Sequence, residues 1–153
     1  MTLGLQHRRD QYLGRQLLKL ERKFTQQSLQ LMNERGLFDI NLGHFSVLPF
    51  IDDTGVRASN VAKQSGISKQ AVGKSIDDLK GKGYISSIDD PSDRRASLIK
   101  LSPKGLKMMD LALQATQEVE QEWEELIGKK KFSLLKHSCS ELLTSLSLNQ
   151  QQV

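Results

Sequence analysis

Cysteine, proline and aromatic residues are all scarce in this chain of 153 residues, which has one cysteine, three prolines and 5% aromatic residues. A single cysteine, Cys139, excludes an intramolecular disulfide and agrees with a reducing compartment. No run of 18 apolar residues is present, so the sequence predicts no transmembrane helix and no membrane association. The N-terminal stretch turns polar at Gln6, too early for a signal peptide, and we therefore expect a cytoplasmic protein.

Motifs typical of enzymes and metal sites are missing as well. There is no Gly-rich phosphate loop, no Gly-x-Ser-x-Gly, no His-Glu-x-x-His and no paired cysteine motif. The histidines His7, His44 and His137 are scattered and have no ligand spacing with the single cysteine. The sequence thus predicts no enzymatic activity, no metal site and no cofactor.

Positive charge is concentrated in one third of the chain. Residues 57–107 hold 11 Lys and Arg against 5 Asp, a net charge of +6, whereas the whole chain carries only +4. A functionless solvated face more often mixes the two signs evenly. The asymmetry therefore favours a polyanionic partner, and double-stranded DNA is the one we expect.

Helical periodicity covers both ends of the chain. Apolar residues recur in steps of four, three, four and seven over 10–34, and in threes and fours after Ser102-Pro103, which is a strong helix start. A last helix carries Phe132 to Leu146. A shorter helix capped by Asn41 precedes the basic segment, and Pro49 is expected to kink or shorten it.

Residues 58–85 carry the pattern of a helix-turn-helix. We expect one helix over 59–65, a turn at Gly66, and a second helix over 69–81 capped by Ser68. Ala62 permits a close approach of the two helices, and Val72 fills the inner face of the second. The outer face of that helix is polar and basic and is predicted to read DNA in the major groove through Ser68, Lys69, Gln70, Gly73 and Lys74. An ordinary helical hairpin with a solvated basic face is the alternative.

A β-hairpin with a charged tip follows directly. Strand-like runs at Tyr84–Ile88 and Ala96–Leu101 flank a polar turn that holds Asp93, Arg94 and Arg95. An acid two residues before an arginine can orient its guanidinium by a bidentate pair, and such an arginine suits the minor groove. We expect these three residues to form a DNA-binding wing, although a solvated loop would look the same in isolation.

The stretch Asp90-Pro91-Ser92-Asp93-Arg94-Arg95, followed by Leu101-Ser102-Pro103-Lys104-Gly105, resembles the wing signature of the MarR family of bacterial regulators. The resemblance is close over about 58–106, and Ser102 stands where the family usually has Thr. It implies a mainly α, winged helix-turn-helix fold with a small β-hairpin wing and long N- and C-terminal dimerisation helices. It also implies a homodimeric regulator, more often a repressor, that binds a pseudo-palindromic operator.

The expected arrangement is a single domain, 1–153, with a winged lobe over 40–102 and a helical dimerisation region over 8–36 and 103–148. The apolar stripes on the long helices extend further than one lobe needs for its own core, which supports dimerisation. The predicted dimer contacts are Leu13, Leu17, Leu135, Leu142 and Leu146.

The resemblance implies a small phenolic or lipophilic effector in some relatives, and His44 is the candidate pocket residue. Cys139 lies on the apolar face of the last helix and is expected to be buried and structural. A winged helix that binds proteins rather than DNA is the competing function.

Overall fold

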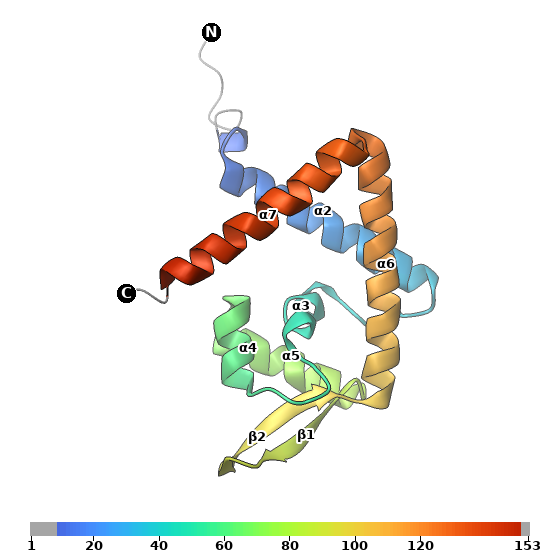
Figure 1. The fold of residues 1–153 in the computed structure, drawn as a ribbon. Helices are drawn as coiled ribbons and strands as arrows, with labels where there is room; N and C mark the ends of the chain where they lie inside the picture. Colours follow the sequence, from blue (N-terminus) through green and yellow to red (C-terminus); the bar gives the residue numbers. More distant parts are fainter. Residues whose placement is uncertain (1–8, 151–153) are drawn as a thin grey trace. The chain divides into compact units, whose positions relative to one another are not determined.

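The computed structural model describes residues 9–150, without the side chains of Arg94, Asn149 and Gln150. The helices and strands follow one another along the chain as α2 (Leu13–Glu34), α3 (Leu42–Phe45), a 3₁₀ turn η1 (Leu48–Phe50), α4 (Ala58–Ser65), α5 (Lys69–Gly81), β1 (Ile85–Asp90), β2 (Asp93–Leu101), α6 (Pro103–Ile127) and α7 (Lys129–Gln150). The order confirms the mainly α fold with one hairpin (Figure 1). Among the described residues, no helix combines the length and the apolar content needed to cross a bilayer.

The chain divides into two compact units, 1–115 and 116–153. The first unit holds a continuous core contributed by every element from α2 to the first half of α6. Its members are mostly aliphatic, as the low aromatic content predicts, and the fully buried ones include Met32, Val47, Val61, Leu79 and Met108. Pro49 lies in the 3₁₀ turn, so the short helix predicted after Asn41 does end early, at Phe45.

The two helices α4 and α5 form the predicted helix-turn-helix. Gly66 ends α4 with φ +68°, a left-handed conformation that a side chain would disfavour. Ser68 then caps α5, and its hydroxyl accepts a hydrogen bond from the backbone N–H of Ala71 at 3.2 Å. Ala62 and Val72 are both buried, which confirms their predicted places between the helices.

The hairpin is longer than its sequence suggested. Its strands β1 and β2 pair antiparallel from Ile85↔Leu101 to Asp90↔Asp93, with a register shift after Asp89. The predicted polar turn is therefore mostly strand, and only Pro91 and Ser92 remain between the two strands. The reason is local, because the Asp90 carboxylate accepts hydrogen bonds from Ser92 and tightens the tip.

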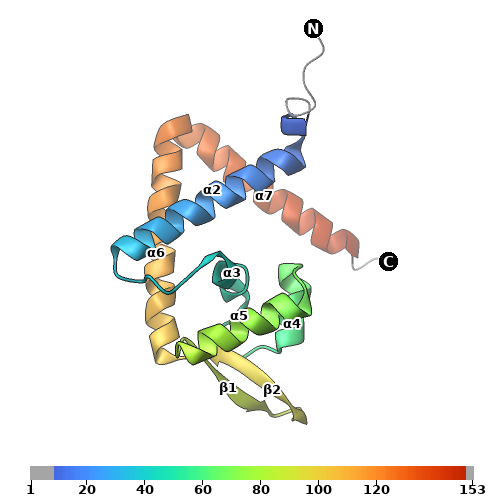
Figure 2. The ribbon, with the colours of Figure 1, turned by 180° about the vertical axis from the view of Figure 1, so that it is seen from behind.

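The start of α6 packs directly against the base of the hairpin. Ser102 Oγ accepts a hydrogen bond from the Gly105 N–H at 3.0 Å and donates one to the Gly83 carbonyl at 2.6 Å. A Cβ at Gly105 would lie 1.9 Å from the carbonyl oxygen of Tyr84. The glycine at this position is thus required by close approach. Figure 2 shows the hairpin extending from this junction, beyond α5.

The second unit consists of the end of α6 and all of α7. Side chains from Ser133 to Leu148 are exposed along α7, including Cys139. The expectation of a buried cysteine is therefore wrong, because the second unit supplies no core against this face of α7. A polar groove of 610 Å³ lies between α6 and α7 and includes Glu120, Phe132 and Lys136. Lys136 Nζ and Glu120 Oε2 form an ion pair of 2.7 Å that links the two helices.

Candidate nucleic-acid interface

The outer face of α5 is available to a partner. Lys69, Gln70 and Lys74 are exposed, and Gly73 lies half-buried among them. No hydrogen bond or ion pair to another described residue occupies the side chains of Lys69, Gln70 or Lys74. The Ser68 hydroxyl accepts from Ala71, so its hydrogen remains available for donation. These five residues lie together on the first two turns of the helix, where helix-turn-helix proteins contact bases.

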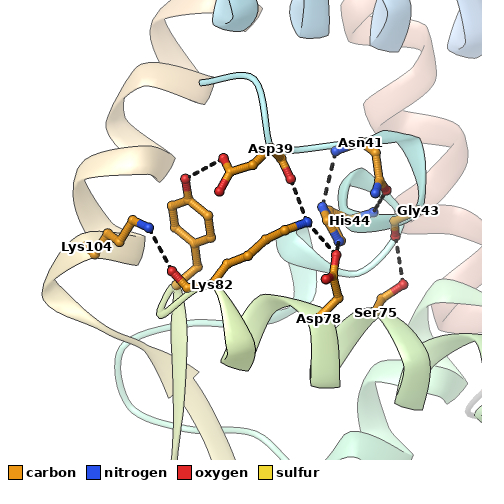
Figure 3. Close-up of polar contacts among 9 residues, drawn as sticks. Asp39, Asn41, Gly43, His44, Ser75, Asp78, Lys82 and Lys104 are labelled. Atoms are coloured by element: carbon orange, nitrogen blue, oxygen red, sulfur yellow. Dashed lines mark hydrogen bonds and ion pairs between the residues drawn. The ribbon is translucent and has the colours of Figure 1, made fainter. Parts of the chain in front are cut away.

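The adjacent flank of α5 instead contacts the segment 39–44, which lies between α2 and α4 in the sequence (Figure 3). Three residues one helical turn apart make the contacts. Ser75 Oγ donates to the Gly43 carbonyl at 3.3 Å, Asp78 Oδ2 lies 2.7 Å from His44 Nε2, and Lys82 Nζ donates to the Asp39 carbonyl at 2.8 Å. We call this row of contacts the polar seam. It fixes the rotation of α5 about its own axis, so that the basic face points away from the core.

The orientation of the His44 ring follows from its two partners. Nδ1 accepts a hydrogen bond from the backbone N–H of Asn41 at 3.2 Å, so the ring hydrogen lies on Nε2 and is donated to Asp78. The Asn41 side chain in turn accepts from the His44 N–H at 3.2 Å, which completes a capping box at α3. His44 is only 2% exposed. Burial lowers the pKa of the imidazole below 6.5, although the hydrogen bond that the ring donates to Asp78 acts in the opposite direction.

Several of the positive charges in 57–107 serve the fold rather than a partner. Lys82 pairs with Asp78 at 2.5 Å and, through this contact, holds the pKa of that carboxyl below its usual value. Lys104 Nζ donates to the Lys82 carbonyl at 2.7 Å and lies 4.3 Å from the centre of the Tyr84 ring. The net charge of this segment therefore overstates the positive charge that remains available to a partner.

The two arginines of the wing are not described to the same extent. Arg95 is 96% exposed at the hairpin, whereas the side chain of Arg94 lies outside the described residues. Asp93 Oδ1 accepts the backbone N–H of Arg95 at 3.1 Å and lies 3.9 Å from Arg95 Nε. The expected bidentate pair between these side chains is not formed, because the carboxylate is engaged by the backbone. Asp93 thus shapes the strand at Arg95 and leaves its guanidinium free to reach outward.

A second carboxylate in the wing, Asp90, binds an arginine that sequence reasoning did not single out. Arg57 Nε donates to Asp90 Oδ2 at 2.6 Å, across 33 positions of the chain. The sequence did hold one sign of this contact: an arginine stands at position 57, where a helix N-cap usually has a short polar residue.

The residues predicted to form the dimer interface are all exposed, each within its own unit. They are Leu13, Leu17, Leu135, Leu142 and Leu146.

Comparison with known proteins relates the winged helix-turn-helix segment to a family. Residues 38–96, from the segment before α3 to the wing, match the model described as the MarR family. This segment of the chain is similar to the MarR family. The recognition made from the wing signature is therefore confirmed, and the family is one of transcription regulators. A search of curated protein sequences gives no match.

Solved structures of transcriptional regulators share the fold over most of the chain. The transcriptional repressor CouR, bound to a 23-mer DNA duplex, is 21% identical, with a TM-score of 0.72 over 94% of this chain and 99% of that one. The regulator PcaV from Streptomyces coelicolor, in complex with its natural ligand, is 14% identical, with a TM-score of 0.69 over 94% and 97%. Wild-type MarR from E. coli, in its apo form, is 24% identical, with a TM-score of 0.67 over 86% and 97%. At these identities the likeness shows the fold, and contacts must be argued from this chain.

Proposed function

We propose that this protein is a MarR-type, cytoplasmic, sequence-specific DNA-binding repressor that occupies a pseudo-palindromic operator as a homodimer. The observation that carries the proposal is the division of α5 into two faces. One face is locked into the polar seam, and the other presents Lys69, Gln70, Gly73 and Lys74 without internal partners among the described residues. A helix held in this way presents base-reading groups in a fixed orientation, as direct readout requires.

The assigned contacts follow from the chemistry of each group. Gln70 can pair bidentately with adenine, and Lys69 or Lys74 can donate to guanine or phosphate. Ser68 has a free hydroxyl hydrogen at the N-terminus of α5, a favourable position for a phosphate contact. Arg95 extends from the wing with 96% exposure, and we assign it, together with Arg94, to the flanking minor groove. Asp93 is assigned to the wing as the residue that shapes the strand at Arg95.

The dimer is supported by the apolar surface that each unit leaves uncovered. Leu13 and Leu17 lie exposed on α2, and Leu135, Leu142 and Leu146 lie exposed one or two turns apart on α7. Stripes of this length on long helices are typical of helix–helix association between chains. A two-fold axis would set two α5 helices about 34 Å apart, one turn of DNA.

Control by a small phenolic or lipophilic effector is part of the proposal, and His44 is the residue through which it would act. Both ring nitrogens already have partners, Asn41 and Asp78. An effector that binds His44 would therefore compete with the polar seam and loosen α5. Binding of phenol or benzoate that weakens DNA affinity in the parent, but not in His44→Gln, would support this route; equal weakening of both would exclude it.

The experiment that tests the proposal is selection of bound duplexes from a random DNA pool at moderate salt, followed by sequencing. We expect an inverted repeat with half-site centres about 10 base pairs apart. Light scattering at micromolar concentration should give the mass of a dimer. If folded protein recovers no motif, or binds no duplex even at low salt, the competing role as a protein-binding winged helix is favoured.

A further inference from the structure

Arg57 occupies the N-cap of α4 but does not cap it. Its guanidinium extends to the hairpin, where Nε donates to Asp90 Oδ2 at 2.6 Å and Nη2 lies 2.5 Å from the same oxygen. Nη2 also donates to Ser92 Oγ at 3.3 Å. One side chain thus connects the beginning of the helix-turn-helix with the tip of the wing.

Asp90 is held in place to receive this arginine. Its side chain is 5% exposed, and its other oxygen, Oδ1, accepts the Ser92 N–H at 2.8 Å and the Ser92 hydroxyl at 2.6 Å. The Ser92 hydrogen bonds, and then Arg57, lower the pKa of Asp90 to about 2, so the carboxylate is charged wherever DNA is bound. Both oxygens are therefore satisfied only when Arg57 is present.

The backbone next to Arg57 holds the opposite end of the wing. Val56 and Ile99 exchange two backbone hydrogen bonds of 2.9 Å, which attach the segment before α4 to β2. A two-stranded hairpin has little stability of its own. The attachment at Val56 fixes the base of this hairpin, and Arg57 fixes its tip relative to α4.

The contacts continue from the tip to the exposed wing arginine. Arg57 Nη2 lies 4.0 Å from Asp93 Oδ2, and Asp93 Oδ1 accepts the backbone N–H of Arg95 at 3.1 Å. A displacement of the tip at Asp90 would therefore move the strand that carries Arg95. Arginine suits this role better than lysine, because its planar guanidinium places two donors on one carboxylate oxygen in a fixed geometry.

We propose that Arg57 is a positioning residue for DNA binding, which holds the wing through Asp90 so that Arg95 reaches the duplex at a set distance from α5. The inference rests on the proposed function. In this role Arg57 does not contact DNA itself, and its effect on DNA affinity is transmitted entirely through the wing.

A double-mutant cycle tests this coupling on a labelled duplex taken from the selection. Arg95→Ala should weaken binding about tenfold in the parent, within the range for loss of one specific arginine contact. In the Arg57→Gln background the same change should weaken binding less than about threefold, because the misplaced wing no longer delivers Arg95. Lys63→Gln, with the same charge change on α4, is the control and should leave the Arg95→Ala effect near tenfold.

Two further measurements separate positioning from loss of folding. Hydrogen exchange at the backbone amides of residues 92–95 should quicken in Arg57→Gln while α5 keeps its protection. Arg57→Lys, which keeps the charge but loses the fixed pair of donors, should show an intermediate coupling and provides the same readout if Arg57→Gln does not fold. A full tenfold effect of Arg95→Ala in both Arg57 variants overturns the inference and leaves the proposed function intact. No effect of Arg95→Ala in the parent overturns both the wing assignment and the inference.

Discussion

The imidazole Nε2 of His44, at the end of α3, lies 2.7 Å from Asp78 Oδ2 on α5, and this contact ties the proposed DNA-reading helix to the segment that follows α2. The imidazole must be neutral to make both of its hydrogen bonds. A proton on Nδ1 would face the Asn41 N–H that now donates to it. The relationship makes the stability of the winged lobe depend on pH.

Acidification is expected to destabilise the fold through His44. The folded-state pKa is lowered from 6.5, so the unfolded chain binds the proton more readily. The stabilising contribution is fully present above pH 6.5 and is lost as pH falls through the folded-state pKa. Thermal unfolding should show a midpoint that falls between about pH 7 and pH 5. His44→Gln should flatten that slope, whereas His137→Gln, on the exposed face of α7, should retain it; equal slopes in all three proteins would contradict the assignment.

The glycine at Gly105 should tolerate no side chain. A Cβ there meets the Tyr84 carbonyl oxygen at 1.9 Å, and backbone on both sides cannot yield cheaply. We expect Gly105→Ala to lower the free energy of unfolding by about 1–3 kcal/mol, the usual cost of overpacking. Denaturant unfolding would measure it, and an unchanged midpoint would show that the α6 junction is looser than described.

Gly73→Ala should stabilise the fold and weaken DNA binding. No atom lies within 4 Å of a Cβ at this position, and alanine favours a helix over glycine by about 1 kcal/mol. The variant should therefore melt at a higher temperature. The added methyl group would stand on the proposed DNA face, so affinity for the selected duplex should fall. Gly81→Ala at the C-terminal end of α5, also without a neighbour within 4 Å, is the control expected to leave DNA affinity unchanged. Parent-like binding by Gly73→Ala would place the DNA elsewhere.

The side chains at the start of α5 should determine sequence preference rather than general affinity. Gln70→Ala and Lys69→Ala are expected to relax selection at particular base pairs, each by about 1–3 kcal/mol of discrimination. Arg95→Ala should instead weaken binding to all duplexes and reduce its salt dependence. Repeating the selection with each variant would distinguish the two classes, and unchanged motifs with Gln70→Ala would remove that residue from the readout.

Cys139 should report on the dimer. It is exposed in the single chain and lies on the same face of α7 as Leu135, Leu142 and Leu146. If that face forms the dimer interface, a maleimide should react slowly with native protein and quickly after unfolding. A thiol moved to the opposite face, in Cys139→Ser with Thr144→Cys, should react quickly in both states. Rapid labelling of native Cys139 in a protein of dimeric mass would show that this part of α7 lies outside the interface.

Local sequence determined the helices, the turn at Gly66, the cap at Ser68 and the helix start at Ser102-Pro103. Each depends on residues within one or two helical turns, so periodicity and capping chemistry are sufficient to predict it. The wing motif indicated the resemblance to the MarR family for the same reason, since its residues are contiguous. The strand ends at Asp90 and Asp93 were less predictable, because the carboxylate that shortens the turn looked like one more charge in a polar loop.

Only the tertiary structure decided which charged groups face a partner and which hold the fold. Arg57 pairs with Asp90 and His44 with Asp78, across 33 and 34 positions, and both pairs depend on how distant elements pack. Likewise, the apolar pattern around Cys139 predicted a buried face without stating what would cover it. An apolar helix face predicts that the face is buried. The sequence pattern does not say whether the residues that cover it come from the same chain. Within the second unit this face of α7 stays exposed, and a second copy of the chain is therefore the expected partner.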